Sequence, residues 1–202
     1  MGRATRWVAM TSLFSTGLFL LIAAITPGPN NLVVMRAAAH GGWKAALHAV
    51  AGVVAGGLVL LLVVVSGADS VFSTWPWLRG AIEAGGALYL VWLGIRMIAA
   101  AGREAGSTAL LGGFAGLFGF QFLNPKSWVM VLTVVAALPA ASAAHAFKYL
   151  APLFMCIPTA CLLLWAALGG AVAPHLIRPL VRQWTDRALG ALLILAALML
   201  FV

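Results

Sequence analysis

Charged residues are scarce in this chain of 202 residues, and acidic residues are the scarcest. The sequence holds 4 Asp and Glu residues in total, and 8% of it is charged, whereas roughly 25% is usual in soluble domains. Hydrophobic residues make up 64% of the chain, and its mean hydropathy is +1.09. Because a soluble domain needs more polar surface than this, the composition predicts an integral membrane protein. It leaves no room for a soluble catalytic or nucleic-acid-binding domain.

Cysteine is nearly absent as well, with 2 residues in the chain. Cys156 and Cys161 have neither the C-x-x-C spacing of a redox pair nor a metal-ligand spacing. On a helix they would lie on different faces, so we expect them to be small packing residues. The sequence also offers no paired carboxylates and no H-E-x-x-H motif. It therefore predicts no enzyme, no redox carrier, no metal site and no cofactor.

Basic residues are present, but they are dispersed at the ends of the apolar stretches. This placement is typical of topology signals, and no clustered basic face predicts a nucleic-acid partner. Counting Lys and Arg by connection favours both termini outside, whereas Arg3 and Arg6 just before the first stretch argue the other way. The sidedness of the termini therefore stays open. The first apolar run is longer than that of a signal peptide, so we expect it to be retained as a helix.

The apolar residues fall into six stretches separated by short connections. Stretches of this length are typical of helices that cross a bilayer, so we predict an all-α membrane protein with about six transmembrane helices in one domain, residues 1–202. Three stretches precede the connection near residues 102–106 and three follow it, which predicts a 3+3 inverted repeat, about 8–100 and about 110–202. The stretches are about 8–39, 45–66, 81–100, 110–138, 149–172 and 188–202.

The first and fourth stretches are each interrupted near the middle by a polar motif that contains proline. The motif at 26–31 reads T-P-G-P-N-N, and the motif at 124–127 reads N-P-K-S. Proline lacks the N–H that a helix needs, so each motif predicts a broken helix with free carbonyls on one side and free N–H groups on the other. Broken helices at matching positions of two halves indicate the substrate site of a secondary transporter.

The two breaks offer ligands for both charges of an amino acid. Free N–H groups at a helix start attract a carboxylate, and free carbonyls at a helix end attract an ammonium group. Gly28-Pro29, Thr26-Pro27 and Asn124-Pro125 are all suitable helix starts. We therefore predict a substrate site formed by Thr26, Pro27, Gly28, Pro29, Asn30, Asn31, Gln121, Asn124, Pro125 and Lys126.

Lys126 is the one strongly charged residue near the middle of an apolar run. A lysine at the bilayer centre costs about 2.5–3.5 kcal/mol on insertion scales, so its presence indicates a function. We expect it to act as the counter-charge for a substrate carboxylate. The alternative is a position nearer the membrane interface, with the ammonium group reaching lipid headgroups.

Two acidic residues lie near the starts of the third and sixth stretches. Glu83 and Asp186 are candidates for binding a coupling ion if they are buried. The alternative, which we favour on sequence proximity, is that they pair with Arg79 and Arg187 at the membrane interface.

With these motifs the chain resembles the LysE/RhtB family of bacterial amino-acid exporters. The resemblance rests on T-P-G-P-N at 26–30, the glycine-rich start of the second stretch, G-A-L-Y-L-V-W-L-G at 86–94 and N-P-K at 124–126. Within the family, the doubled asparagine, His40-Gly41 and F-Q-F-L-N at 120–124 are most similar to the cysteine/O-acetylserine exporter branch. Many members carry an acidic or histidine side chain near residues 57–60, where this chain has G-L-V-L.

The resemblance implies efflux of amino acids or close derivatives by alternating access across the bacterial inner (cytoplasmic) membrane. The implied partners are a small neutral amino acid, the lipid bilayer and a coupling proton or other ion, with a homo-oligomer left open. One alternative is efflux of another solute such as a metal cation, against which the scarcity of intramembrane carboxylates and thiols argues. The other is a membrane subunit that does not transport.

Overall fold

The computed structural model describes residues 3–68, 74, 75, 77–99, 101, 113–136 and 143–198, without the side chains of 3–13, 68, 78, 79, 82, 83, 177 and 196. The elements of these residues are all helical, which confirms the predicted all-α class. They are α1 (Arg3–Ile25), α2 (Pro29–Val63), the π-helical turn η1 (Val64–Ala68), α4 (Trp77–Ala99), α5 (Phe114–Phe120), α6 (Pro125–Ala136), α7 (Ala143–Val172), the 3-10 turn η3 (Ala173–Ile177) and α8 (Pro179–Leu198).

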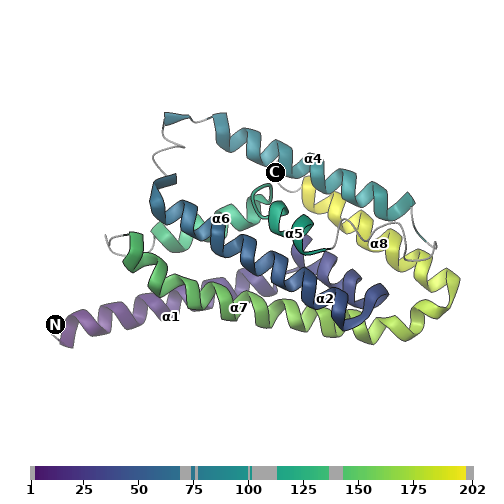
Figure 1. The fold of residues 1–202 in the computed structure, drawn as a ribbon, viewed down its shortest axis with the longest axis horizontal. Helices are drawn as coiled ribbons and strands as arrows, with labels where there is room; N and C mark the ends of the chain where they lie inside the picture. Colours follow the sequence, from purple (N-terminus) through teal and green to yellow (C-terminus); the bar gives the residue numbers. More distant parts are fainter. Residues whose placement is uncertain are drawn as a thin grey trace.

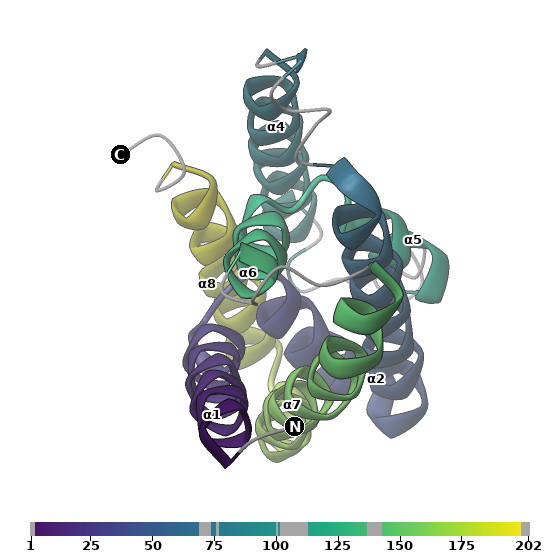
Figure 2. The same cartoon turned by 90° about the vertical axis from the view of Figure 1, so that its left-hand side faces the viewer.

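The chain reverses direction inside α2, at Gly42. Its backbone angles there are φ 66° and ψ −168°, a left-handed φ that glycine adopts without the steric penalty other residues incur. We call residues 29–41 the first leg of α2 and residues 43–63 the second leg. The reversal falls within the predicted connection between the first two stretches. Successive segments of the chain run in alternating directions along the long axis (Figures 1 and 2). In chain order these segments are α1 together with the first leg of α2, then the second leg of α2, then α4, then α5 together with α6, then α7, and finally α8.

Close approach of backbones holds α5 against the second leg of α2. A Cβ atom at Gly52 would lie 2.4 Å from the carbonyl oxygen of Phe114, and one at Gly56 would lie 2.5 Å from that of Phe118. Any larger residue at either position would therefore push the two helices apart. These two glycines therefore serve helix packing.

Helices α4 and α8 pack against each other in the same way. A Cβ atom at Gly94 on α4 would lie 2.6 Å from the carbonyl oxygen of Gly190 on α8, and one at Gly190 would lie 2.7 Å from that of Gly94. Buried apolar side chains of α4 and α8, among them Leu90 and Leu193, continue into the main core with α2, α5 and α7. The two halves of the chain therefore share one core.

The outer surface is unusually apolar. Phe14 is 74% exposed and Leu88 is 71% exposed, and other large apolar side chains point outwards along most of the helices. Two helical stretches, Pro29–Gly67 and Ala143–Leu176, are long and apolar enough to cross a membrane, and shorter apolar helices cover Phe14–Ile25, Ala84–Ala99 and Pro125–Ala136. This surface suits lipid contact, as the composition predicts.

Three helices begin earlier than their apolar stretches. α4 begins at Trp77, α7 at Ala143 and α8 at Pro179, whereas the stretches begin near 81, 149 and 188. The first turns of these helices carry polar residues, so hydropathy assigns them to the connections. As a result Asp186, predicted to precede the sixth helix, lies well inside α8.

Candidate functional site

The first break separates α1 from α2 where the sequence predicts it. The last backbone hydrogen bond of α1 runs from the Thr26 N–H to the Ile22 carbonyl (3.2 Å). Gly28 is extended, with φ −166° and ψ 176°, and Pro29 occupies the first turn of α2. Of the two predicted restart points, Gly28-Pro29 is therefore the one used.

Side chains from α2 and α7 donate hydrogen bonds to the freed carbonyls at the end of α1. Asn31 Nδ2 donates to the carbonyl oxygens of Ala24 and Thr26, both at 2.9 Å. Trp165 Nε1 on α7 donates to the Ile25 carbonyl at 3.3 Å. The Asn31 amide, predicted to offer itself to a substrate, thus also stabilises the break itself.

The second break separates α5 from α6. Residues 121–123 form tight turns, and Trp128 Nε1 donates to the Phe122 carbonyl freed there (2.9 Å). Asn124 Oδ1 accepts the backbone N–H of Lys126 at 3.1 Å. Asn124 is therefore the N-cap of α6 with Pro125 next to it, as the sequence predicts.

The two breaks touch each other in the folded chain. Asn30 and Gln121 exchange two side-chain hydrogen bonds, each 3.1 Å long. Ser127 Oγ also donates to Gln121 Oε1 at 2.8 Å, and the Gln121 side chain is 1% exposed. A buried polar side chain with all these partners is costly to replace. Gln121 is therefore the centre of the contact between the halves.

Lys126 crosses from the second break to the first. Its Nζ donates to the Thr26 carbonyl at 2.9 Å, where the negative end of the α1 dipole favours a cation. A Cβ atom at Gly28 would lie 3.0 Å from the same Nζ, so the ammonium group packs directly on the break. Among the described residues, no carboxylate lies within ion-pair distance of Lys126.

A small cavity opens at this junction. It has a volume of about 50 Å³ for the centres of water molecules, which is room for a few waters. Six of the predicted site residues line it. The other four, Thr26, Pro27, Gln121 and Pro125, belong to the two breaks but do not line the cavity. Its lining consists of Ala23, Ala24, Gly28, Pro29, Asn30, Asn31, Val53, Asn124, Lys126, Ser127, Met130, Pro158 and Leu162.

Several residues of this junction are absent from the sequence prediction. Ser127 belongs to the N-P-K-S motif at 124–127, so its position next to Lys126 could have identified it as a site residue. Pro158 lies inside α7, and a proline within an apolar run signals a local distortion. Val53, Met130 and Leu162 carry no such signal, because apolar residues are common in every stretch.

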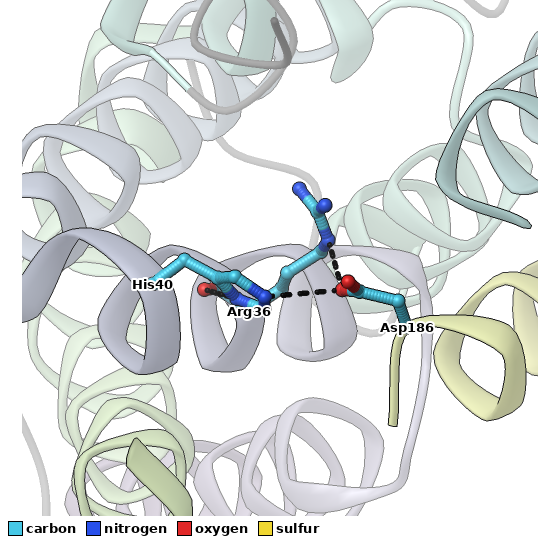
Figure 3. A network of polar contacts seen from close by, with 3 residues as sticks. All are labelled: Arg36, His40 and Asp186. Carbon is cyan, nitrogen blue, oxygen red and sulfur yellow. Dashed lines mark hydrogen bonds and ion pairs between the residues drawn. The ribbon is translucent and has the colours of Figure 1, made fainter. Parts of the chain in front are cut away.

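Asp186 does not pair as the sequence suggests. Its Oδ1 lies 3.1 Å from Arg36 Nε and 3.2 Å from His40 Nε2, both on the first leg of α2 (Figure 3). The predicted pairing with Arg187 is therefore wrong: that guanidinium lies over the Trp184 ring instead. Asp186 is buried, at 1% exposure. The side chains of Glu83 and Arg79 lie outside the described residues.

Replacing Gln121 by leucine should weaken the junction. The change keeps the volume but leaves Asn30, Ser127 and the Leu117 carbonyl without their partner. We expect a loss of on the order of 1–3 kcal/mol in the free energy of unfolding, seen as a lower melting temperature of the detergent-purified protein. Gln183→Leu, at a half-buried position of α8, is the matched control. Equal melting temperatures for the two variants would contradict the assignment.

Comparison with known proteins identifies the chain at family level. The family model described as LysE type translocator matches residues 21–202. Proteins named cysteine/O-acetylserine efflux protein are similar over nearly their whole length: one from Escherichia coli O139:H28 is 29% identical over 196 residues, covering 95% of this chain and 98% of the relative. The protein from Escherichia coli K12 is 28% identical over the same coverage.

A protein of the same name from Shigella flexneri is 28% identical over 188 residues, covering 91% of this chain and 94% of the relative. No solved structure gives a significant match. These families are translocators and efflux proteins rather than enzymes, and their names support a role in amino-acid export. Because the family model covers most of the sequence, the chain belongs to the LysE family of translocators.

Proposed function

We propose that this protein exports small neutral amino acids or close derivatives, of the cysteine and O-acetylserine kind, across the bacterial inner membrane. The observation that carries the proposal is the position of Lys126, whose ammonium group lies between two broken helices and beside a cavity. The names of the similar efflux proteins point to the same substrate class. Lys126 is half-buried and, among the described residues, has no carboxylate partner, so its ammonium group is suited to an anionic group of the substrate.

The substrate carboxylate would bind the Lys126 ammonium group and the free N–H groups at the start of α2. A lysine ammonium group has three donors, and the bond to Thr26 uses one of them. The substrate ammonium group would meet carbonyls at the end of α1. Its side chain would then face Val53, Met130 and Leu162, which line the apolar part of the cavity and favour small, weakly polar side chains.

Transport requires this site to open first to one side and then to the other. The cavity holds only a few waters, so an amino acid enters only if the breaks separate. The Asn30–Gln121 contact joins the two halves at this point, and its hydrogen bonds would be exchanged for bonds to the substrate. Six spans in a 3+3 inverted repeat, which the alternating directions of the helices suit (Figure 1), would give this motion its symmetry.

The test is direct export from cells. Cells that lack their own exporters would express the chain, receive a panel of dipeptides, and release the resulting amino acids into the medium for quantification. We expect faster release of cysteine and a few small neutral amino acids than from cells with an empty vector. Equal release of every amino acid in both strains would overturn the proposed function.

A further inference from the structure

The apolar side of the cavity has walls that are fixed by their surroundings. Val53 on the second leg of α2 and Leu162 on α7 line the cavity, and both are buried members of the main core, at 5% and 3% exposure. Pro158, which lies one turn before Leu162 on α7, lines the cavity with a rigid ring. Side chains in a close-packed core have little room to move, so these three residues give the cavity a constant boundary.

Met130 on α6 is a wall of a different kind. Its side chain is partly buried and lines the cavity, and it also packs against a second cluster of buried side chains that includes Leu60 and Phe154. Methionine is unbranched and has a flexible, polarisable side chain, so it fills spaces of irregular shape and adapts to new neighbours. Among the described residues on the apolar side of the cavity, Met130 is therefore the one best able to change its shape.

Met130 also lies in register with the predicted anchor of the substrate. It follows Lys126 by one turn of α6, and residues four apart lie on the same face of a helix. Both side chains line the same cavity, which has a volume of about 50 Å³ for the centres of water molecules. A substrate with its carboxylate at Lys126 has little space for a long side chain there. Since the other apolar walls are fixed, additional length has to be accommodated by Met130.

We propose that Met130 determines the length of the amino-acid side chain that this protein accepts. This inference rests on the proposed function and names a specificity-determining residue for it. Once the breaks have separated, a short side chain such as that of cysteine requires no movement of Met130. A longer one, such as that of O-acetylserine, requires the methionine to turn towards the cluster of Leu60 and Phe154. One site thereby accepts both lengths, at a cost that grows with the length of the chain.

The test compares two competitors that differ only in length. Purified protein in lipid vesicles would exchange radiolabelled L-cysteine, kept reduced, against unlabelled cysteine in the presence of L-2-aminobutyrate or L-norleucine. The side chain of 2-aminobutyrate is as long as that of cysteine, and that of norleucine is two methylene groups longer. The readout is the concentration of norleucine for half inhibition divided by that of 2-aminobutyrate. This ratio does not depend on how much active protein the vesicles contain.

Two substitutions of Met130 should move this ratio in opposite directions. Met130→Ala shortens the wall, and one methylene in an apolar pocket changes binding by about tenfold or more, so the ratio should fall at least roughly tenfold. Met130→Ile keeps a similar volume but branches at Cβ, which leaves essentially one χ1 rotamer in a helix. This wall cannot yield to norleucine, so the ratio should rise, again by about tenfold. An unchanged ratio in either variant, or a shift against the expected direction, would overturn the proposal.

Met155→Ala is the matched control. Met155 lies on α7, is 51% exposed and does not line the cavity, so its replacement should leave the ratio at the wild-type value. An equal shift in this variant would contradict a special role for Met130. Normal exchange of cysteine with a ratio that ignores Met130 would overturn this inference alone. A wild-type protein that exchanges no cysteine would instead overturn the proposed function, and this inference with it.

Discussion

Lys126→Ala should abolish amino-acid export while leaving the protein in the membrane. The change removes the one cation at the junction of the two breaks, whose Nζ binds the Thr26 carbonyl. Lys126 is half-buried, and a hydrogen bond to a charged group is worth about 1.5–3 kcal/mol, which corresponds to at least roughly tenfold weaker binding of the substrate. Export per molecule from dipeptide-loaded cells, normalised to membrane abundance, is the measurement.

Two further variants serve as controls for this result. Lys44→Ala removes an exposed lysine of α2 and should export normally. Lys126→Arg keeps the charge but adds bulk against Gly28, which already packs on the lysine side chain, so partial export is expected. If Lys126→Ala exported at the wild-type rate but melted at a lower temperature, Lys126 would serve only to cap α1, a role worth about 0.3–1 kcal/mol at an exposed helix end.

Gly86→Ala should lower the abundance of the protein in the membrane several-fold. A Cβ atom at this position of α4 would lie 1.8 Å from the carbonyl oxygen of Leu123 and 3.0 Å from Pro125 Cδ, both at the second break. Backbone atoms cannot yield as a flexible side chain does, so α4 would have to move away. Overpacking of this kind costs typically about 1–3 kcal/mol or more, enough to lower abundance several-fold. Quantitative blotting of membranes checks the result.

The neighbouring glycine provides the control. A Cβ atom at Gly85 would meet only the end of the Leu123 side chain, at 3.8 Å. Alanine favours a helix over glycine by about 1 kcal/mol, so Gly85→Ala should be neutral or slightly stabilising. Normal abundance of Gly86→Ala would show that α4 does not pack on the break as described.

The breaks are the part of the site that sequence predicts best, because their cause is local. A proline removes its own N–H and restrains the residue before it, so the interruptions at 26–28 and 121–124 follow from the residues there. The cap at Asn124 follows in the same way. The reversal at Gly42 also falls where the apolar pattern is interrupted.

Contacts between distant residues could not be predicted in this way. Asn30 and Gln121 are 91 positions apart, and Arg36 and Asp186 are 150 apart. Sequence proximity offers Asp186 its neighbour Arg187, but on a helix adjacent residues point in different directions, and folding brings Arg36 instead. The early start of α8 was missed for a related reason, since its first turns contain polar residues such as Asp186, which faces α2 rather than lipid.

The first leg of α2, with a glycine at each end, carries the amides of the break at its start and the charged cluster near its far end. One short piece of chain therefore holds both the contact between the breaks and the ion pair between α2 and α8. A substitution at Asn30 that admits a new solute would alter the position of the same rod that presents His40 to Asp186. Changes to the polar contacts at the start of the leg should therefore also disturb the contact between α2 and α8 at its far end, and compensating changes would lie outside the leg.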